Sequence, residues 1–550
     1  MRYSGVLLIL ILLLTGGNLS ARTWVFFNEL PRSGEFAGTD RAVARLLKAG
    51  VDPASTRNQS VDPAWIAELQ EQGAVVYNVS RWLNAVSIAD DPELSQRLAA
   101  MWPVREVRPV KTFHRQLLEP ASTKRTPATE QSTIYGGSWT QLAQMGVPTL
   151  HDLGYTGEGV FIGMLDTGWQ LYRDALAHAE VVAVWDFYND DPIVEFEEGD
   201  HPSQDHHGTS TLGCIAAWAP TNLVGAAYDA AFALAKTEHV DHEINAEEDD
   251  FVAGLEWLDS LGVDIVSTSL GYSRFDPGQQ NYTIDDLNGD ICITTVACDL
   301  AAARGIFVVT SAGNTGNDND IWHGLITSPA DGDSVMAVGA VAADSLIALF
   351  SSRGPTADGR IKPDFVAMGA GTWIINTSTG QGQSSYTSGY GTSFAGPLLA
   401  GAAALLLQID PGLLPMELAT LMKAHASHGA LPDTAYGWGL VDLPRVAWAL
   451  LATEPTMGVN GISVFPNPFN NRLSFLIDLP NGLASPVQVD LYDLLGRLAC
   501  SKASSGIQDD DRLLITLLPP AALADGIYFA VLTLIDSDRS IGQVKCIKLE

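Results

Sequence analysis

From about residue 140 to about residue 452, apolar runs of strand length alternate with runs of helical character. Strand-like runs at Val160–Leu165, Val263–Ser267 and Ile306–Thr310 alternate with helix-like runs at Thr209–Trp218 and Cys292–Arg304. Strands that are separated by helices form a mostly parallel sheet with helices on both faces. The sequence therefore predicts an α/β domain in this part of the chain.

The regions on either side have different patterns, as expected for a chain of 550 residues, which is long enough for two to four domains. Residues 22–120 mix both kinds of run, which predicts a small α+β domain. Its predicted strands and helices are Trp24–Phe27, Pro63–Gln72, Ala74–Val79, Pro92–Met101 and Val104–Val110. After Pro455, short alternating runs are separated by Pro, Gly and Asn, which predicts an all-β module at 458–550.

A segment rich in Pro, Thr and Ser, Glu119–Ser132, separates the first two regions and carries the basic pair Lys124-Arg125. Such a composition is typical of an exposed linker. An ordinary loop is the alternative, but the position between two patterned regions favours a processing site.

The N-terminus has the order of a secretory signal peptide. Arg2 precedes the apolar run Val6–Leu14, and small and polar residues follow up to Ser20 and Ala21. This run is shorter than the roughly 20 residues that span a bilayer. We therefore predict a signal peptide at 1–21 and a secreted protein. The apolar run Leu398–Leu407 instead predicts a buried helix.

The charge balance excludes one class of partner. The chain has 64 acidic and 31 basic residues, a formal net charge of −33. Nucleic-acid binding needs clustered Lys and Arg, so we expect no nucleic-acid partner. A self-repelling, soluble surface explains the excess, and an acidic cleft that prefers basic substrates is the alternative.

Four short stretches carry side chains suited to nucleophilic catalysis. Asp166 lies in Gly163-Met-Leu-Asp166-Thr-Gly168 at the end of a predicted strand, and His207 in His206-His207-Gly208-Thr209 opens a predicted helix. Asn314 follows a strand in Ser311-Ala-Gly-Asn314-Thr-Gly316, and Ser393 precedes a helix in Gly391-Thr-Ser393-Phe-Ala395-Gly-Pro397. Each stretch alone has an ordinary explanation as a turn or a helix start. Their occurrence together, in one predicted α/β region, is far more specific than any one of them alone.

The order Asp, His, Asn, Ser resembles that of the subtilisin-like serine protease family, peptidase S8. The resemblance covers about 310 residues, from Tyr135 to Leu451. Further similar stretches are Gly154-Tyr-Thr-Gly157-Glu-Gly159, Ser269-Leu270-Gly271 and Tyr436-Gly-Trp-Gly439. The resemblance implies a serine-type endopeptidase domain at 135–452 with a subtilisin-like, mostly parallel sheet flanked by helices.

The resemblance also implies residue roles. Ser393 is the expected nucleophile, His207 its general base, and Asp166 the group that orients His207. Asn314 is expected to stabilise the oxyanion. His206 is assigned a surface or supporting role, because the family motif places the base directly before Gly-Thr. Phe394 stands where the family more often has Met, which keeps the position apolar.

Two segments are expected to bind protein and peptide substrates. By resemblance, Ser269, Leu270 and Gly271 pair with an extended substrate as an added strand. Ser311, Ala312 and Gly313 are expected to line the pocket for the residue before the cut, and their small size suggests room for a large side chain. The chemistry requires no cofactor. The resemblance allows a structural calcium ion, to which no ligand residue is assigned.

The flanking segments resemble accessory domains of secreted proteases. Residues 22–125 resemble an inhibitory pro-domain with its linker, which would make the enzyme a zymogen. The stretches Phe465-Pro-Asn467-Pro468-Phe469, Leu491-Tyr-Asp493-Leu-Leu-Gly496-Arg497, Gly526-Ile-Tyr528 and Lys545–Leu549 resemble those of type IX secretion sorting domains, small β-sandwiches. This resemblance implies that the type IX secretion machinery is a partner. A generic carbohydrate- or wall-binding β domain is the alternative.

Two other functions are compatible with parts of the pattern. An inert subtilisin-like scaffold used for binding would not need Asp166, His207, Asn314 and Ser393 all intact. A hydrolase of non-peptide esters usually has a Gly-x-Ser-x-Gly turn, which Ser393 lacks.

The five cysteines are Cys214, Cys292, Cys298, Cys500 and Cys546, an odd number that leaves at least one unpaired within the chain. Candidate pairs are Cys292 with Cys298 and Cys500 with Cys546. Cys214 is expected to be a buried free thiol.

The acidic run Glu243–Asp250 precedes a predicted helix, Phe251–Leu258. We interpret it as a solvated loop with carboxylates at a helix start. A place beside the cleft, where it would favour basic substrates, is the alternative.

Overall fold

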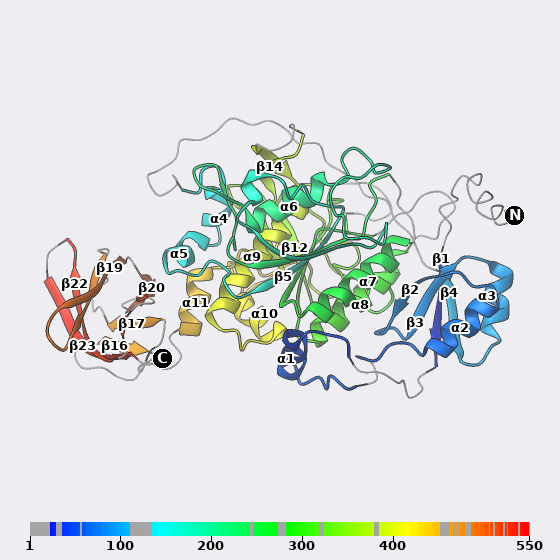
Figure 1. Ribbon diagram of the computed structural model, residues 1–550. Helices are drawn as coiled ribbons and strands as arrows, with labels where there is room; N and C mark the ends of the chain where they lie inside the picture. The colour runs from blue at the N-terminus through cyan, green and yellow to red at the C-terminus, as the bar shows by residue number, and fades with distance from the viewer. Residues whose placement is uncertain are drawn as a thin grey trace, which may run out of the picture.

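The computed structural model divides the chain into three parts along its long axis (Figure 1). We call them the N-terminal region (22–109), the central domain (134–451) and the C-terminal sandwich (462–548). The structure describes residues 22–28, 36–55, 58–109, 134–241, 246–272, 282–317, 324–378, 384–451, 462–465, 469, 472–478, 486–504, 506–509, 512–520, 523–524, 526–536 and 539–548. The predicted signal peptide and the predicted linker Glu119–Ser132 lie outside these residues.

The N-terminal region contains an antiparallel sheet in the order β2-β3-β1-β4, so its predicted α+β class is confirmed. The strands are β1 (Arg22–Phe27), β2 (Val76–Ser80), β3 (Ala85–Ala89) and β4 (Val104–Pro109). Helices α2 (Pro63–Glu71) and α3 (Pro92–Ala99) each begin with Pro after a capping Asp, Asp62 and Asp91. Strand β3 was not among the predicted elements.

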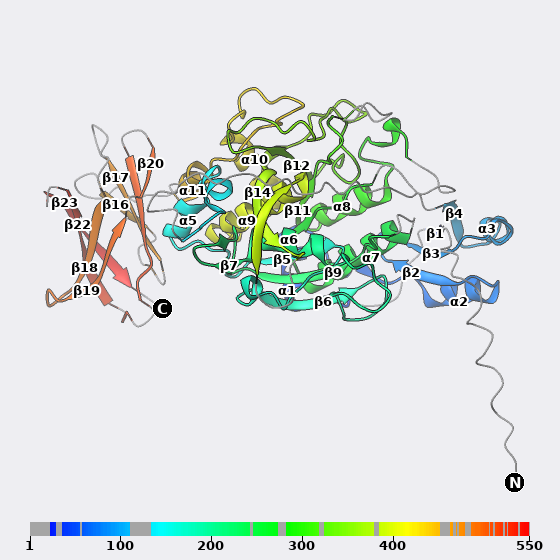
Figure 2. The same cartoon turned by 90° about the horizontal axis from the view of Figure 1, so that it is seen from above.

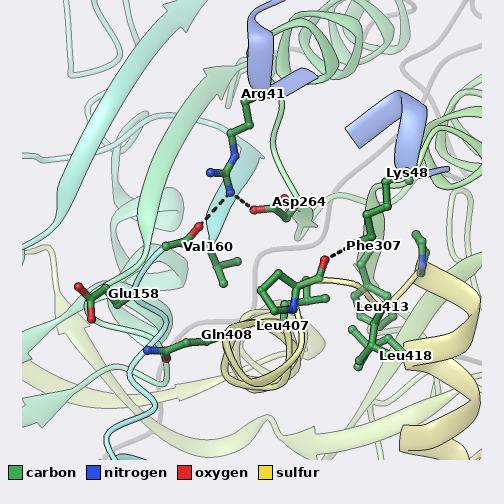
Figure 3. A pocket seen from close by; sticks show the side chains of 14 residues that line it. Arg41, Lys48, Glu158, Val160, Asp264, Phe307, Leu407, Gln408, Leu413 and Leu418 are labelled. Carbon is green, nitrogen blue, oxygen red and sulfur yellow. Dashed lines mark hydrogen bonds and ion pairs between the residues drawn. The ribbon is translucent and has the colours of Figure 1, made fainter. Parts of the chain in front are cut away.

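A further helix of the N-terminal region, α1 (Asp40–Lys48), lies apart from this sheet and against the central domain (Figure 1). Arg41 of α1 donates to the carbonyl of Gly159 at 3.0 Å and also contacts Asp264. Lys48 Nζ donates to the carbonyl of Pro411 at 2.6 Å (Figure 3). The sequence patterns did not predict this helix.

The central domain is built on seven parallel strands in the order β13-β12-β11-β10-β5-β9-β6, which confirms the predicted fold class. Their bounds are β5 (Phe161–Asp166), β6 (Glu180–Asp186), β9 (Ala231–Lys236), β10 (Ile265–Thr268), β11 (Phe307–Ser311), β12 (Val335–Val341) and β13 (Phe365–Met368). Every residue of β5, β10, β11, β12 and β13 is buried. Such continuous apolar strands require cover on both faces.

Helices supply this cover on both sides (Figure 2). On one face, α6 (His206–Ala216), α9 (Thr392–Ile409) and α11 (Leu443–Leu451) share a core with alternate strand residues such as Met164. On the other face, α7 (Ala246–Leu261) and α8 (Ile293–Ala303) share a core with the intervening ones, such as Leu165. Helices α7 and α8 also lie between the central sheet and the sheet of the N-terminal region (Figure 1).

Smaller elements complete the central domain. They are α4 (Trp139–Ala143), α5 (Val147–Asp152), α10 (Pro415–Ala424), the short strands β7 (Trp218–Ala219) and β8 (Leu223–Val224), and the hairpin β14 (Ala370–Asn376) with β15 (Ser385–Tyr390). Helix α9 is the described helix long and apolar enough to cross a membrane, but 89% of it is buried in the domain. The run Leu398–Leu407 therefore forms the buried core helix that its composition predicts.

The C-terminal sandwich contains two antiparallel sheets, β16-β17-β21-β20 and β19-β18-β22-β23, around a shared apolar core. Its strands are β16 (Ile462–Phe465), β17 (Leu473–Asp478), β18 (Val487–Asp493), β19 (Leu498–Ser504), β20 (Ile507–Asp509), β21 (Arg512–Leu517), β22 (Gly526–Leu534) and β23 (Arg539–Lys548). Arg472 donates to the hydroxyl of Tyr155 at 2.8 Å, and Arg512 lies over the ring of Trp448. The sandwich therefore contacts the central domain beside α5 and α11.

Both candidate disulfides are wrong, because all five cysteines are free thiols. Strands β18 and β22 separate Cys500 on β19 from Cys546 on β23, which places them roughly 14 Å apart at the usual strand spacing. Cys292 immediately precedes α8 and Cys298 lies within it, six positions later, which corresponds to a helical rise of about 9 Å. Cys214 is the buried free thiol that was predicted, and burial raises its pKa to about 12.

Candidate active site

Asp166 is the last residue of β5, at the carboxyl end of a central strand, and its side chain is buried. Its Oδ1 accepts a hydrogen bond from Nδ1 of His207 at 2.7 Å and from the backbone N–H of Thr167 at 2.8 Å. Its Oδ2 accepts from the hydroxyl of Thr211 at 3.0 Å. These donors hold the carboxylate in one orientation toward the imidazole.

His207 is the second residue of α6, and its ring is mostly buried. Helix α6 can approach β5 because Gly208 has no side chain: a Cβ there would lie 2.2 Å from the carbonyl oxygen of Gly168. Since Nδ1 faces Asp166, the other ring nitrogen, Nε2, points away from that carboxylate. The ring lies 6.4 Å from that of Phe394, the residue after Ser393.

Ser393 is the second residue of α9 and is almost fully buried. Gly391, which precedes the helix, has a φ of 151°, a conformation that favours glycine. A Cβ at Gly391 would lie 3.9 Å from Cβ of Ser393 and 3.7 Å from Nδ2 of Asn314. The serine and the asparagine amide therefore both lie close to Gly391.

The backbone carbonyl of Ser393 has an unusual donor. Four residues further along α9 stands Pro397, which has no N–H to donate to that carbonyl as a helix normally would. The hydroxyl of Ser269, just after β10, donates to it instead at 2.9 Å. Ser269 thereby fastens the first turn of α9 to the central sheet.

Asn314 lies beyond the end of β11, as the sequence predicts. Its Oδ1 accepts hydrogen bonds from the backbone N–H of Thr392 at 2.9 Å and from the Thr392 hydroxyl at 3.0 Å. These two bonds fix the amide so that the NH₂ group faces the region of Gly391 and Ser393. The four predicted residues Asp166, His207, Asn314 and Ser393 thus come together at the carboxyl edge of the sheet.

The two predicted substrate segments flank this edge. Ser269, Leu270 and Gly271 follow β10, and Ser311, Ala312 and Gly313 lie at and beyond the end of β11. The side chain of Leu270 is buried in the core under α7 and α8, so only the backbone of this segment is available for pairing.

Thr327, which sequence reasoning missed, lies between these segments. A Cβ at Gly271 would come within 2.7 Å of its hydroxyl, and a Cβ at Gly313 within 3.3 Å. This hydroxyl is buried and has no hydrogen-bond partner among the described residues. Thr327 therefore takes up part of the space that the small residues leave.

Thr211 was also missed as a contact of Asp166. The signal was present, because Thr211 follows His207 by four residues and so lies on the same face of α6. His206, the rival of His207, has its Nε2 3.9 Å from Oδ1 of Asp205. Burial lowers the pKa of His206, and Asp205 opposes the effect.

The solvated interpretation of the acidic run is wrong for Glu247, Glu248, Asp249 and Asp250. All four are at most 1% exposed at the start of α7, although they are helix-start carboxylates as predicted. They are buried because partners from distant segments cover them: Tyr282 donates to Glu248 at 2.8 Å, and Arg22 contacts Asp249 and Asp250.

Among the described residues, three carboxylates lie close enough to share a metal ion. Ligand oxygens of Asp186, Asp191 and Glu197 lie within 4.8 Å of one another. The ammonium group of buried Lys236 already lies 2.7 Å from Asp186 Oδ2. A cation of the protein itself thus balances part of this cluster.

The chain is similar to known proteins over two of its three parts. Residues 157–439 match the sequence model of the subtilase family, and residues 22–128 match that of a peptidase S8 propeptide domain from Bacteroidota. Serine protease AprX of Bacillus subtilis is 29% identical over 318 residues, covering 52% of this chain and 66% of AprX. Subtilisin DY of Bacillus licheniformis is 30% identical over 298 residues, covering 54% of this chain and 93% of that protein.

A solved structure of proteases from Pseudoalteromonas arctica PAMC 21717 is also similar. It is 22% identical with a TM-score of 0.46, and the match covers 58% of this chain and all of that one.

Proposed function

The chain belongs to the subtilase family of serine proteases, and we propose that it is a secreted endopeptidase with Asp166, His207 and Ser393 as its catalytic triad. The observation that carries this proposal is the Asp166–His207 hydrogen bond beside Ser393, at the carboxyl edge of a parallel sheet. Ligand and active sites of open α/β sheets occur at this edge.

The geometry supports the following chemistry. Nε2 of His207 takes the proton of the Ser393 hydroxyl while Oγ attacks the substrate carbonyl. Asp166 keeps Nδ1 protonated and stabilises the imidazolium. Collapse of the tetrahedral intermediate breaks the peptide bond, His207 gives its proton to the leaving amine, and an acyl-enzyme remains. Water, activated by His207, then hydrolyses the acyl-enzyme without a cofactor.

Asn314 and the start of α9 supply the oxyanion site. The Asn314 NH₂ group is already oriented by its two bonds from Thr392, so no reorganisation is required during the reaction. The backbone N–H of Ser393 lies in the first turn of α9, where helix N–H groups have no intrahelical acceptor. The substrate would pair with the backbone of Ser269–Gly271 and place one side chain near Thr327 and Ser311–Gly313.

The flanking parts have supporting roles in this proposal. The N-terminal region, which matches a propeptide domain, inhibits the enzyme until cleavage between about 115 and 135. The C-terminal sandwich directs export through the type IX secretion machinery. If it only sorts, a chain without 458–550 keeps its peptidase activity, and loss of activity in the folded truncation would contradict that role.

The test is hydrolysis of unfolded casein by the processed wild type and by Ser393→Ala, with a serine-directed phosphonate probe. We expect casein cleavage and labelling to disappear together in the variant. A folded, processed wild type that neither cleaves casein nor reacts with the probe would disprove the proposal.

A further inference from the structure

The N-terminal region covers one face of α7 through two separate groups of charged residues. The first group lies at the start of the helix and contains Asp249, Asp250 and Arg22 of β1. The second lies at its end, where Asp259 contacts three arginines. Carboxylates outnumber cations in the first group, and cations outnumber carboxylates in the second.

The first group has one cation for two carboxylates. Arg22 Nη1 lies 3.4 Å from Asp249 Oδ2 and 3.1 Å from Asp250 Oδ1, and both carboxylates are at most 1% exposed. Asn78 of β2 donates a further hydrogen bond to Asp250 Oδ1 at 2.8 Å. One oxygen of each carboxylate, Asp249 Oδ1 and Asp250 Oδ2, is buried without a hydrogen-bond partner among the described residues.

Among the described residues, Arg22 is the basic side chain that contacts this pair. From the N-terminal region, Ser87 of β3 lies beside Asp249, and the ring of Tyr77 lies 4.5 Å from the guanidinium of Arg22. From the central domain, the facing groups are Asp186 and Tyr188, and Glu247 and Glu248 precede the pair on α7. Lys236 lies 2.7 Å from Asp186 Oδ2 and offsets that carboxylate, so among the described residues Arg22 is the cation in contact with the pair itself.

The second group is balanced differently. Asp259 accepts hydrogen bonds from Arg45, Arg81 and Arg304, and Arg81 also contacts Glu256 at 3.5 Å. This group therefore contains three cations for two carboxylates. Burying an unbalanced charge is far more costly than burying a balanced one, and a carboxyl group avoids that cost by taking up a proton.

We propose that the N-terminal region binds α7 with uptake of a proton by the Asp249–Asp250 pair, so that it is held tightly at mildly acidic pH and loosens as the pH rises. If this region inhibits the enzyme as proposed above, its affinity for the central domain therefore depends on pH. The proposal concerns binding alone, so its test does not depend on peptidase activity.

The pKa values agree in sign with the charge imbalance. Burial raises the pKa of Asp249 to about 7 and that of Asp250 to about 6, although Arg22 opposes both shifts. Once the N-terminal region leaves, water reaches both carboxylates and their pKa values return toward the ordinary range near 4. Because the bound state has the higher pKa, the gain in binding is complete below that ordinary range and is lost as the pH rises through about 6 to 7.

The contribution of Asp259 to binding depends on pH in the opposite sense. Burial would raise its pKa, but Arg45, Arg304 and Arg81 together lower it. Its contribution is therefore present above the ordinary carboxyl range and is lost only in stronger acid. The pKa of Glu256 is raised by burial against Arg81, so the variants must separate it from the Asp249–Asp250 pair.

The experiment uses the full chain with Ser393→Ala and a site-specific protease sequence placed between residues 110 and 133. The chain is cut there, and the dissociation constant of the cleaved N-terminal region is measured from pH 5 to pH 8. We expect the dissociation constant to rise at least about tenfold over this range, since each linked proton gives up to tenfold per pH unit.

Variants at the pair identify the groups that titrate. Asp249→Asn mimics the protonated carboxyl, so we expect its affinity at pH 8 to match that of the parent at pH 5.5, with a flatter pH profile. Asp250→Asn keeps the acceptor for Asn78 and serves as the second variant if Asp249→Asn does not fold. The matched control Asp259→Asn should weaken binding at every pH without flattening the profile.

Two outcomes would overturn the proposal. One is a dissociation constant of the parent chain that stays constant or falls as the pH rises. The other is a folded Asn variant of the pair whose pH profile has the same slope as that of the parent.

Discussion

Different parts of the chain contact the two ends of strands β5, β10 and β11. At their carboxyl ends, Asp166, Ser269 and Asn314 are fixed by residues of the central domain itself. At their amino ends, α1 of the N-terminal region binds beside Val160, Asp264 and Phe307 (Figure 3). The carboxyl edge, where we propose the active site, is thus held by the central domain alone, while the opposite edge is covered by a segment that lies in the match to a propeptide domain.

This difference separates two kinds of effect. Substitutions at the carboxyl edge should change the rate of hydrolysis in the processed enzyme. Substitutions at the amino edge should change the stability of the unprocessed chain and leave the processed enzyme unaffected.

The largest effect is expected for Asp166→Asn. The amide can no longer hold His207 in the tautomer that accepts the serine proton, and we expect kcat to fall about 10⁴-fold. Casein or peptide hydrolysis by the processed variant measures it. A loss below about tenfold would show that Asp166 does not orient the base.

Asn314 tests the second part of the carboxyl edge. Removing one donor to an oxyanion typically lowers kcat about 10²–10³-fold with little change in KM. We compare Asn314→Ala with Asn314→Asp, which keeps the acceptor for Thr392 but lacks the NH₂ donor. Both variants should lose kcat. If Asn314→Asp retained full activity, the residue would only position Thr392.

Arg45 tests the amino edge. It donates to the carbonyl of Val263 at 2.8 Å and contacts Asp259, both buried. In the Ser393→Ala chain, Arg45→Met should lower the free energy of unfolding by about 1–3 kcal/mol, since Asp259 keeps Arg81 and Arg304. Urea denaturation measures this change. The processed enzyme made from the Arg45→Met chain with Ser393 intact should have the parent kcat, and a lower kcat would contradict the separation of the two edges.

The smallest effect is expected at Ser269. Ser269→Ala removes the donor to the Ser393 carbonyl, and the loss of one hydrogen bond corresponds to a fall in kcat of about five- to tenfold. Pro397→Ala restores a backbone N–H that can donate to the same carbonyl. The double variant should therefore recover most of the lost kcat. Equal activity of Ser269→Ala with and without Pro397→Ala would show that this carbonyl does not need a donor.

Much of the fold could be predicted from sequence because its signals are local. The apolar runs of β5 and α9 and the motifs around Asp166 and His207 each lie within a few residues. What could not be predicted depends on partners far along the chain. The burial of Asp249 depends on Arg22, 227 residues away, and Thr327 meets Gly271 only after folding.

The two predicted disulfides were wrong for a related reason. Sequence spacing says nothing of strand order, and β18 and β22 separate Cys500 from Cys546. Helix α1 was missed because it has only nine residues and packs against the central domain instead of the sheet of its own region (Figure 1).

The position of α1 has a consequence for how the N-terminal region leaves. Helix α1 contacts Val263 and Pro411, the β1–β4 sheet contacts the start of α7, and the two meet at Asp259, which binds Arg45 of α1 and Arg81 of the β2–β3 turn. When one contact opens, the other keeps the detached part at a high effective concentration, so it rebinds before the whole region escapes. Departure thus requires both contacts to be open at once, and the region behaves as a bivalent ligand whose residence time exceeds that of either contact alone.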